Sequence, residues 1–210
     1  PNIDLKAKDD YGCTALMWAC LGGHKDVVQL LLDYSVSNID LNARDNYGKT
    51  PLMFACYNGH KDVVQLLLDN FKRIKLNTRD DDGMTAFMIS CEKGHKDIVK
   101  LLLDYPNSNI DLNAKDQRTY TAFMMACKEG HKGVVQLLLD HSDQNIDLNV
   151  RTHGFHFSGF TAFMWACING HKDVVKLLLD HSDRINLNAR DRYESTNYGQ
   201  TAFMKACQEG

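Results

Sequence analysis

The chain has 210 residues, of which 44% are hydrophobic and 24% are charged, and its formal net charge is −3. This composition is that of a globular protein long enough to bury a sizeable core. It lacks the basic excess that nucleic-acid binding needs, and its apolar runs fall far short of the roughly 20 residues of a membrane span.

A repeat dominates the sequence. The motif Thr-(Ala/Pro)-(Leu/Phe)-Met starts at Thr14, Thr50, Thr85, Thr121, Thr161 and Thr201. Regular spacing of this kind is typical of stacked arrays. We therefore expect one domain over 1–210, with full units at about 1–36, 37–71, 72–107, 108–147 and 148–187 and a partial unit at 188–210. Because the chain lacks an initiator Met and the last unit is cut short, we expect a segment of a longer protein.

The second unit shows the elements expected in each unit, in chain order. Residues 39–48 carry turn residues and predict an extended arm with a hairpin-like tip. Thr50 is a candidate helix N-cap, and Pro51 follows at the first helical position, where its missing N–H costs nothing. A first helix is expected over 52–56, ending at Gly59, a residue suited to a left-handed C-terminal position.

A second helix is expected over residues 60–69, with Asp62 in its first turn, where a carboxylate favours the helix dipole. Its three consecutive leucines point to more than one face of the helix, so the helix must be covered on more than one side. A two-helix unit cannot do this alone, whereas stacking on neighbouring units can.

Several residues of this unit resemble the ankyrin repeat: Asn42-Ala43-Arg44-Asp45, Gly48, Thr50-Pro51-Leu52, Ala55, Gly59-His60 and Val64 with Leu67-Leu68. The resemblance covers essentially the whole chain. It implies an all-α fold, an ankyrin-repeat solenoid of stacked antiparallel helix pairs with hairpin-like fingers. The period exceeds the roughly 33 residues usual in the family, and this long-period variant resembles the arrays of large DNA viruses and intracellular bacteria.

Cysteine recurs at one helical position, four residues before a His in each full unit: Cys20, Cys56, Cys91, Cys127, Cys167 and Cys207. A structural zinc site needs four ligands, and each unit offers two. We therefore expect no metal and no cofactor, buried thiols, and a His that bridges the two helices of its unit. Stacked helices lie about 8–10 Å apart, too far for equivalent cysteines to form disulfides.

Free thiols indicate a reducing compartment, so we expect a cytoplasmic protein, with the nucleus, or the host cytosol of a viral or bacterial protein, as alternatives. Cys13 lies outside the cysteine ladder and is expected to be exposed near a finger. Met takes the place of the His that often follows Thr-Pro-Leu in the family, and thioether packing is expected there.

No catalytic set and no phosphate-binding loop emerge, so we expect no enzyme. By the resemblance, the chain is a protein–protein interaction scaffold that binds through its concave surface and finger tips. The candidate partner-binding residues are Tyr11, Trp18, Tyr47, Phe54, Tyr57, Met84, Ile89, Tyr120, Met125, Phe155, Phe157, Phe160 and Trp165. Their aromatic content is typical of protein interfaces.

The partner is an unknown protein, and the chain is expected to be monomeric or part of a longer chain. Two other interpretations stay open. The array could be a structural spacer or a substrate-recruiting segment of a larger multidomain protein. The asparagines that follow a Leu in each arm, such as Asn42, also resemble those hydroxylated in some ankyrin proteins.

The fourth unit is expected to be the weakest. Thr119 stands where a turn Gly belongs, and Gly133 replaces the Asp that starts the second helix. Units three to five should therefore open locally before the array melts, as measured by native-state amide exchange. Uniform protection from the second unit to the fifth would contradict this prediction.

Overall fold

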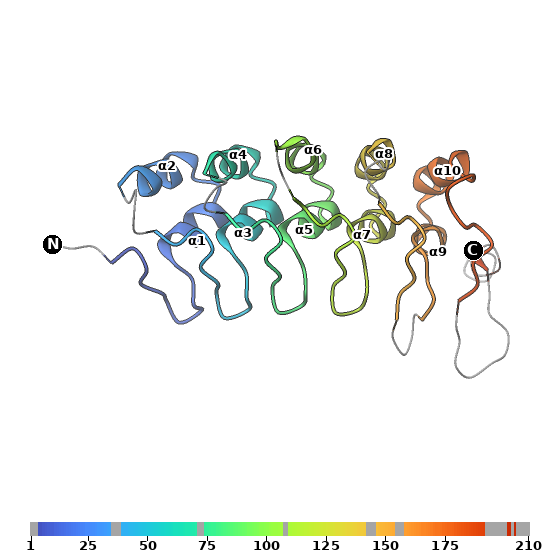
Figure 1. Cartoon of the computed structure of the whole chain (residues 1–210), viewed down its shortest axis with the longest axis horizontal. Helices are drawn as coiled ribbons and strands as arrows, with labels where there is room; N and C mark the ends of the chain where they lie inside the picture. The colour runs from blue at the N-terminus through green and yellow to red at the C-terminus, as the bar shows by residue number, and fades with distance from the viewer. Residues whose placement is uncertain are drawn as a thin grey trace. The chain divides into compact units, whose positions relative to one another are not determined.

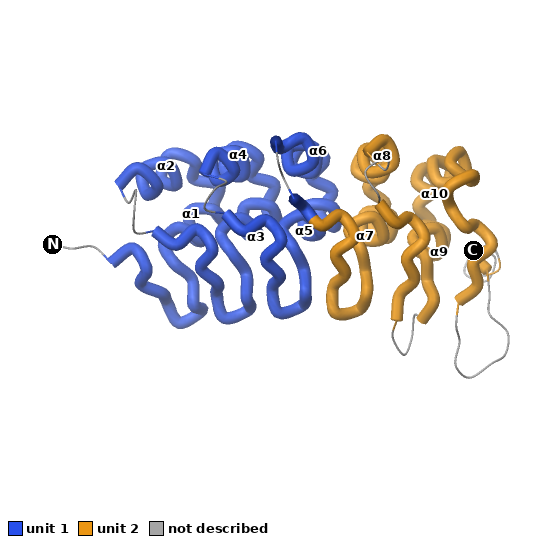
Figure 2. Tube along the Cα trace, in the orientation of Figure 1, with its two compact units in different colours: residues 1–110 blue, residues 111–210 orange. Residues whose placement is uncertain are grey.

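The computed structural model describes residues 4–34, 39–70, 74–106, 109–141, 146–153, 158–191, 201–202 and 204. The chain forms two compact units, residues 1–110 (unit 1) and residues 111–210 (unit 2) (Figure 2). Each unit is built from short helix pairs.

Unit 1 contains α1 (Ala15–Leu21), α2 (Lys25–Tyr34), α3 (Pro51–Tyr57), α4 (Lys61–Asp69), α5 (Ala86–Glu92) and α6 (Lys96–Asp104). The first helices of the pairs, α1, α3 and α5, form one layer, and α2, α4 and α6 form a second layer over it (Figure 1). Three loops that we call fingers, residues 4–14, 39–50 and 74–85, project from the layer of first helices. This is the expected all-α arrangement of stacked helix pairs.

Unit 2 repeats the pattern with α7 (Ala122–Lys128), α8 (Lys132–Asp140), α9 (Ala162–Ile168) and α10 (Lys172–Asp180). Helix α7 packs against α9, and α8 packs against α10. Its fingers precede α7 and α9 (Figure 1).

Each first helix begins at a threonine cap. Thr50 has extended backbone, and its hydroxyl accepts the N–H of Met53 at 3.4 Å. The Met53 sulfur in turn accepts the Thr50 N–H at 3.4 Å, so the methionine completes a capping box, a place that Glu or Gln usually fills. The predicted cap at Thr50 is confirmed, and Gly59 follows the helix in the left-handed conformation, as predicted. The sequence predicts only apolar packing for the Met53 thioether. The side chain is buried, at 1% exposed, but its sulfur also accepts a hydrogen bond.

The His that recurs in the repeat units makes hydrogen bonds between neighbouring helix pairs. His60 Nε2 donates to the Leu21 carbonyl at 3.0 Å, and His95 Nε2 donates to the Tyr57 carbonyl at 3.0 Å. In unit 2, His171 makes the same bond to the carbonyl of Lys128. The expectation that His bridges the two helices of its own unit is therefore wrong. The last carbonyls of the preceding first helix have no intrahelical partner, and the His ring supplies one.

Four members of the cysteine ladder in the described part of the chain are buried, as predicted, while Cys207 lies outside the described residues. Cys20, Cys56, Cys91 and Cys127 are 0% exposed, and Cys167 is half-buried. The expected exposure of Cys13 is wrong, because it is 7% exposed. Its N–H bonds to the Asp9 carboxylate at 2.8 Å, and the chain turns inward here to the cap of α1.

Thiol chemistry offers a test of this packing. Burial raises the pKa of Cys20 and Cys56 to about 12 and that of Cys167 to about 11. Since the thiolate is the nucleophile, alkylation of Cys56 in the native chain should be at least about 100-fold slower than in urea. Cys167 should react before Cys56 in a time course read by peptide mass spectrometry. Equal rates for Cys56 in the native and unfolded chain would show that it is not buried.

Thr119 is the residue other than glycine with a left-handed backbone among the described residues, at φ 66. Thr119 therefore adopts the left-handed backbone conformation that a turn glycine would adopt at lower cost, as the sequence predicts. Its hydroxyl oxygen accepts the N–H of His153 at 2.7 Å, which ties two fingers of unit 2 together. Gly133 is the second residue of α8, so it lies in the first turn and not in the middle of the helix, where a glycine costs roughly 0.5–1 kcal/mol. Early opening of this region stays a prediction.

Candidate functional site

The fingers of unit 1 are held by aspartate side chains. The Oδ1 atom of Asp45 accepts the N–H groups of Tyr47 and Lys49 at 2.9 and 2.7 Å. Asp9 does the same for Tyr11 and Cys13 in the first finger, at 3.0 and 2.8 Å. Such bonds fix a turn that the backbone alone would leave free. The first two fingers therefore present Tyr11 and Tyr47 from a defined backbone.

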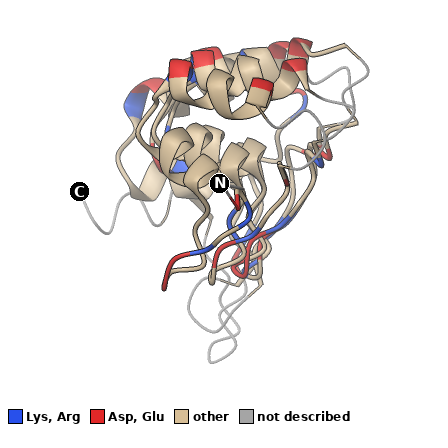
Figure 3. Cartoon of the chain, turned by 90° about the vertical axis from the view of Figure 1, so that its left-hand side faces the viewer, with Lys and Arg blue, Asp and Glu red and all other residues tan. Residues whose placement is uncertain are grey.

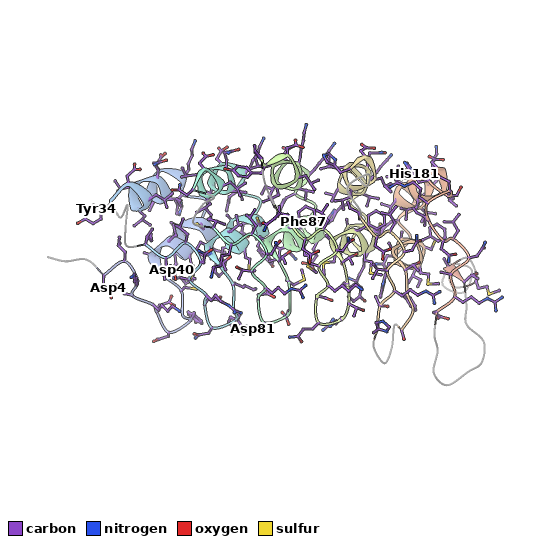
Figure 4. The ribbon with its side chains drawn as sticks, in the orientation of Figure 1. Asp4, Tyr34, Asp40, Asp81, Phe87 and His181 are labelled. Atoms are coloured by element: carbon purple, nitrogen blue, oxygen red, sulfur yellow. The ribbon has the colours of Figure 1, made fainter. Side chains whose placement is uncertain are left out.

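Neighbouring fingers of unit 1 also bind one another. The Asn46 N–H donates to the Tyr11 carbonyl at 3.0 Å, and the Asp81 N–H donates to the Tyr47 carbonyl at 3.0 Å. Arg44 reaches across to the Asp81 carboxylate at 3.0 Å. The three fingers thus form one hydrogen-bonded row, and Asp81 marks its third tip (Figure 4).

Four exposed rings lie on these fingers and on the first helices behind them. The exposed fractions are 63% for Tyr11, 48% for Trp18, 63% for Tyr47 and 47% for Tyr57. Phe54 of α3 is half-buried at the position equivalent to Trp18. We call these five residues the aromatic face of unit 1.

Two rings of this face are oriented by charged neighbours. The Trp18 indole N–H donates to Asp9 Oδ2 at 2.8 Å, which joins α1 to the first finger. The ammonium groups of Lys93 and Lys49 lie 4.7 and 5.8 Å from the centroid of the Tyr57 ring. Cation–π contacts of this length restrain a ring without burying it.

Other predicted site residues are not on the surface. Ile89, Met125, Phe160 and Trp165 are at most 6% exposed, so their expected exposure is wrong. Trp165 packs in unit 2 with its ring centroid 5.1 Å from that of Phe160. Met84 and Tyr120 are half-buried. Phe155 and Phe157 lie outside the described residues.

Burial of Trp165 has a physical reason that the repeat pattern hides. Trp18 bonds to an aspartate of its own finger, whereas the equivalent finger position before α9 is Thr152, which is 1% exposed. Phe160 and Tyr120 instead cover the Trp165 ring, with the Tyr120 centroid 5.6 Å away. Two tryptophans at one repeat position therefore have opposite exposure.

Acidic residues lie at the ends of the fingers (Figure 3). Asp10, Asp81 and Asp82 are exposed there. Desolvation raises the pKa of Asp9, but its bonds from the N–H groups of Cys13, Trp18 and Tyr11 outweigh this, so the pKa lies below the ordinary value of 3.8. Asp9 and Lys93 were missed by the sequence analysis, although an Asp recurs at the start of the first four turns.

The depressed pKa of Asp9 predicts an acid titration that Trp18 reports. Because the folded pKa is lowered, the charged bond persists as pH falls past 3.8 and is lost only below it. The indole N–H resonance of Trp18 should therefore shift with a midpoint below 3.8, and Asp9→Asn should abolish that shift. The Trp165 resonance is the internal control. A Trp18 midpoint at or above 3.8 would contradict the bond.

In the part of the chain that the structure describes, no three His, Cys, Asp or Glu side chains come together in a way that could hold a metal ion. None of the described helices is long and apolar enough to cross a membrane.

Comparison with known proteins agrees with this architecture. A family model described as "Ankyrin repeats (3 copies)" matches residues 1–80, 71–152 and 144–210. Osteoclast-stimulating factor 1 of Monopterus albus is 56% identical over 32 residues, which cover 15% of this chain and 15% of that protein. Ankyrin repeats are generally protein-interaction modules and typically have no enzymatic activity. The match to the family model runs through the whole sequence, and this chain belongs to the ankyrin repeat family.

Proposed function

We propose that the aromatic face of unit 1 binds a partner protein and that the chain acts as an interaction scaffold in the cytoplasm. The observation that carries the proposal is the group of four exposed rings on adjacent, hydrogen-bonded fingers and helices. Tyrosine and tryptophan bury a large area at a small cost in side-chain entropy, and they are enriched at the centres of interfaces.

The hydrogen bonds of the fingers support the proposal further. Asp9 and Asp45 fix the two tyrosine-bearing turns, and Trp18 is fixed by Asp9. A surface that is ordered before binding loses little conformational entropy when the partner arrives. The mechanism is therefore rigid presentation, in which the stacked helices hold the rings and the partner supplies a complementary surface.

The face differs from the full set of residues that the sequence predicts. Tyr11, Trp18, Tyr47, Phe54 and Tyr57 form its centre. Met84 and Tyr120 are half-buried, and we do not include them in the proposed binding surface. We also leave out the buried residues Ile89, Met125, Phe160 and Trp165.

The test combines affinity capture with variants. The purified chain and the triple variant Tyr11→Ala, Trp18→Ala, Tyr47→Ala are immobilised and exposed to the same cell extract. Proteins bound by the native chain and lost from the variant are then measured singly. Trp18→Ala should weaken the Kd of such a partner by at least about 30-fold, the effect of a hot-spot residue.

Tyr34→Ala is the matched control, because Tyr34 is 69% exposed but lies at the end of α2. It should leave the Kd unchanged, and circular dichroism should show that every variant keeps its helices. If the triple variant retained all bound proteins, the array would act as a spacer and the proposal would be wrong.

A further inference from the structure

The rings of the aromatic face are spaced at a regular interval. In each of the first two repeats, a fingertip tyrosine precedes a ring on the first helix: Tyr11 precedes Trp18, and Tyr47 precedes Phe54. The fingers lie side by side, and α1 packs against α3 (Figure 1). Since packed helices lie about 8–10 Å apart, the two pairs of rings are separated by about the same distance.

The hydrogen-bond donors that this surface offers are tyrosine hydroxyls. The N–H groups of Tyr47 and Lys49 already bond to the Asp45 side chain, and the Gly48 N–H bonds to the Asp45 carbonyl. Within the described residues, the hydroxyls of Tyr11 and Tyr47 have no hydrogen-bond acceptor. A ligand that satisfies them must bring acceptors of its own, such as free backbone carbonyls.

The third finger carries a carboxylate at the position of the two tyrosines. Asp82 is equivalent to Tyr11 and Tyr47, and it is exposed. Its neighbour Asp81 is paired with Arg44 at 3.0 Å, whereas no Lys or Arg in the described part of the chain is paired with Asp82. Along the row, a ring, a ring and a carboxylate therefore follow one another at intervals of one repeat. A complementary ligand needs two apolar groups and then a cation at the same intervals.

Three regular backbones can be compared with this interval. A β-strand repeats a side-chain direction every two residues, or about 6.6 Å, which is too short. An α-helix returns to one face after seven residues, or about 10.5 Å, but its carbonyls are used in its own hydrogen bonds. A polyproline II helix repeats every three residues, or about 9.3 Å, and leaves its carbonyls free. Only the last backbone matches both the interval and the donors.

We infer that the aromatic face binds a proline-rich segment in the polyproline II conformation, with a Lys or Arg three residues from the nearer bound proline. One proline contacts Tyr11 and Trp18, and the proline three residues along contacts Tyr47 and Phe54. The basic residue reaches Asp82, and the two tyrosine hydroxyls donate to carbonyls of the segment. Such a segment is extended before it binds, so it loses little conformational entropy. The inference rests on the proposed function and names the class of segment that the partner offers.

Synthetic peptides with blocked ends test the inference. The probes are fluorescein-labelled Ala-Pro-Pro-Ala-Pro-Pro-Ala-Arg and the same residues in reverse order, because either chain direction can place prolines and Arg at intervals of three. Fluorescence anisotropy measures their Kd for the full chain. At least one probe should bind saturably. Adding one Ala between its two proline pairs should weaken binding by at least about tenfold, because the second proline then turns away from its rings.

Variants of Tyr47 separate the ring from its hydroxyl. Tyr47→Ala should weaken the Kd of the bound probe by at least about 30-fold, the effect of a hot-spot residue. Tyr47→Phe keeps the ring and loses one hydrogen bond, so it should weaken the Kd by about two- to tenfold. Tyr34→Ala, which removes an exposed ring outside the aromatic face, should leave the Kd unchanged.

A charge exchange tests the role of Asp82. Asp82→Lys should weaken binding of the Arg probe by at least about threefold, the scale of an exposed ion pair. The same probe with Glu in place of Arg should bind the Asp82→Lys variant more tightly than it binds the native chain. Both differences should shrink at high salt, because the charges are exposed to solvent.

The inference fails if neither probe binds, if the lengthened peptide binds as tightly as its parent, or if the charge exchange changes nothing. These failures are distinct from failure of the proposed function. A captured protein that depends on Tyr11, Trp18 and Tyr47, together with probes that do not bind, would overturn the proline-rich segment alone. A triple variant that retains all captured proteins would overturn the proposed function, and the inference with it.

Discussion

Replacing Phe87 by alanine should destabilise unit 1 by about 3–5 kcal/mol, the usual cost of removing a buried aromatic ring. Phe87 is 2% exposed and belongs to α5, where its side chain lies between the two helix layers (Figure 4). Truncation loses the transfer free energy of the ring and leaves a cavity that short helices, fixed by their caps, cannot close. The measurement is the free energy of unfolding in urea, together with amide exchange of α3 to α6.

The chain supplies the control for this substitution. Leu16 and Leu52 occupy the equivalent position in the two preceding pairs, and they are 1% and 2% exposed. Phe87→Leu should therefore cost less than about 1.5 kcal/mol, as for other apolar exchanges of similar volume. If the alanine variant lost no more stability than the leucine variant, the ring would not be filling the core as described.

Replacing Gly23 by alanine should cost about 1.5–3.5 kcal/mol of unfolding free energy, from two causes. Gly23 has φ 69, a conformation that costs an L-residue roughly 1–2 kcal/mol. A Cβ atom there would also lie 2.4 Å from His60 Nδ1. The ring must move, and the bond from His60 to the Leu21 carbonyl, worth about 0.5–1.5 kcal/mol, is lost with it. Urea unfolding of the purified variant measures the sum.

Gly170 separates the two causes. It has the same φ of 69, but nothing lies within 4 Å of its added Cβ. Gly170→Ala should therefore show the backbone cost alone, about 1–2 kcal/mol. In a His60→Ala background, Gly23→Ala should cost no more than Gly170→Ala, which a double-mutant cycle can measure. An undiminished cost in that background would mean that the His60 ring is not the obstacle.

Much of the fold follows from groups that are close together in the sequence. The threonine cap, the methionine three residues later and the Asp-led turn make their bonds within four residues of one another. Local bonds of this kind repeat wherever the residues repeat, so the sequence predicts the helices and fingers of every unit. Stacking also follows, because a helix with three adjacent leucines needs cover on more than one side.

The candidate site depended instead on contacts between residues far apart in the sequence. Trp18 and Trp165 share a repeat position, but one is 48% exposed and the other 5%. Finger residues decide the difference: Asp9 holds the Trp18 indole at the surface, while Phe160 and Tyr120 cover the Trp165 ring. His60 likewise bonds to a carbonyl 39 residues away.

The sequence by itself thus determined the repeat, its caps and its turns, because short-range hydrogen bonds and apolar periodicity act within one unit. Only the tertiary structure decided which rings remain exposed and where each His finds its acceptor. Exposure is set by what neighbouring helix pairs and fingers cover, and residues with the same place in the repeat have different neighbours.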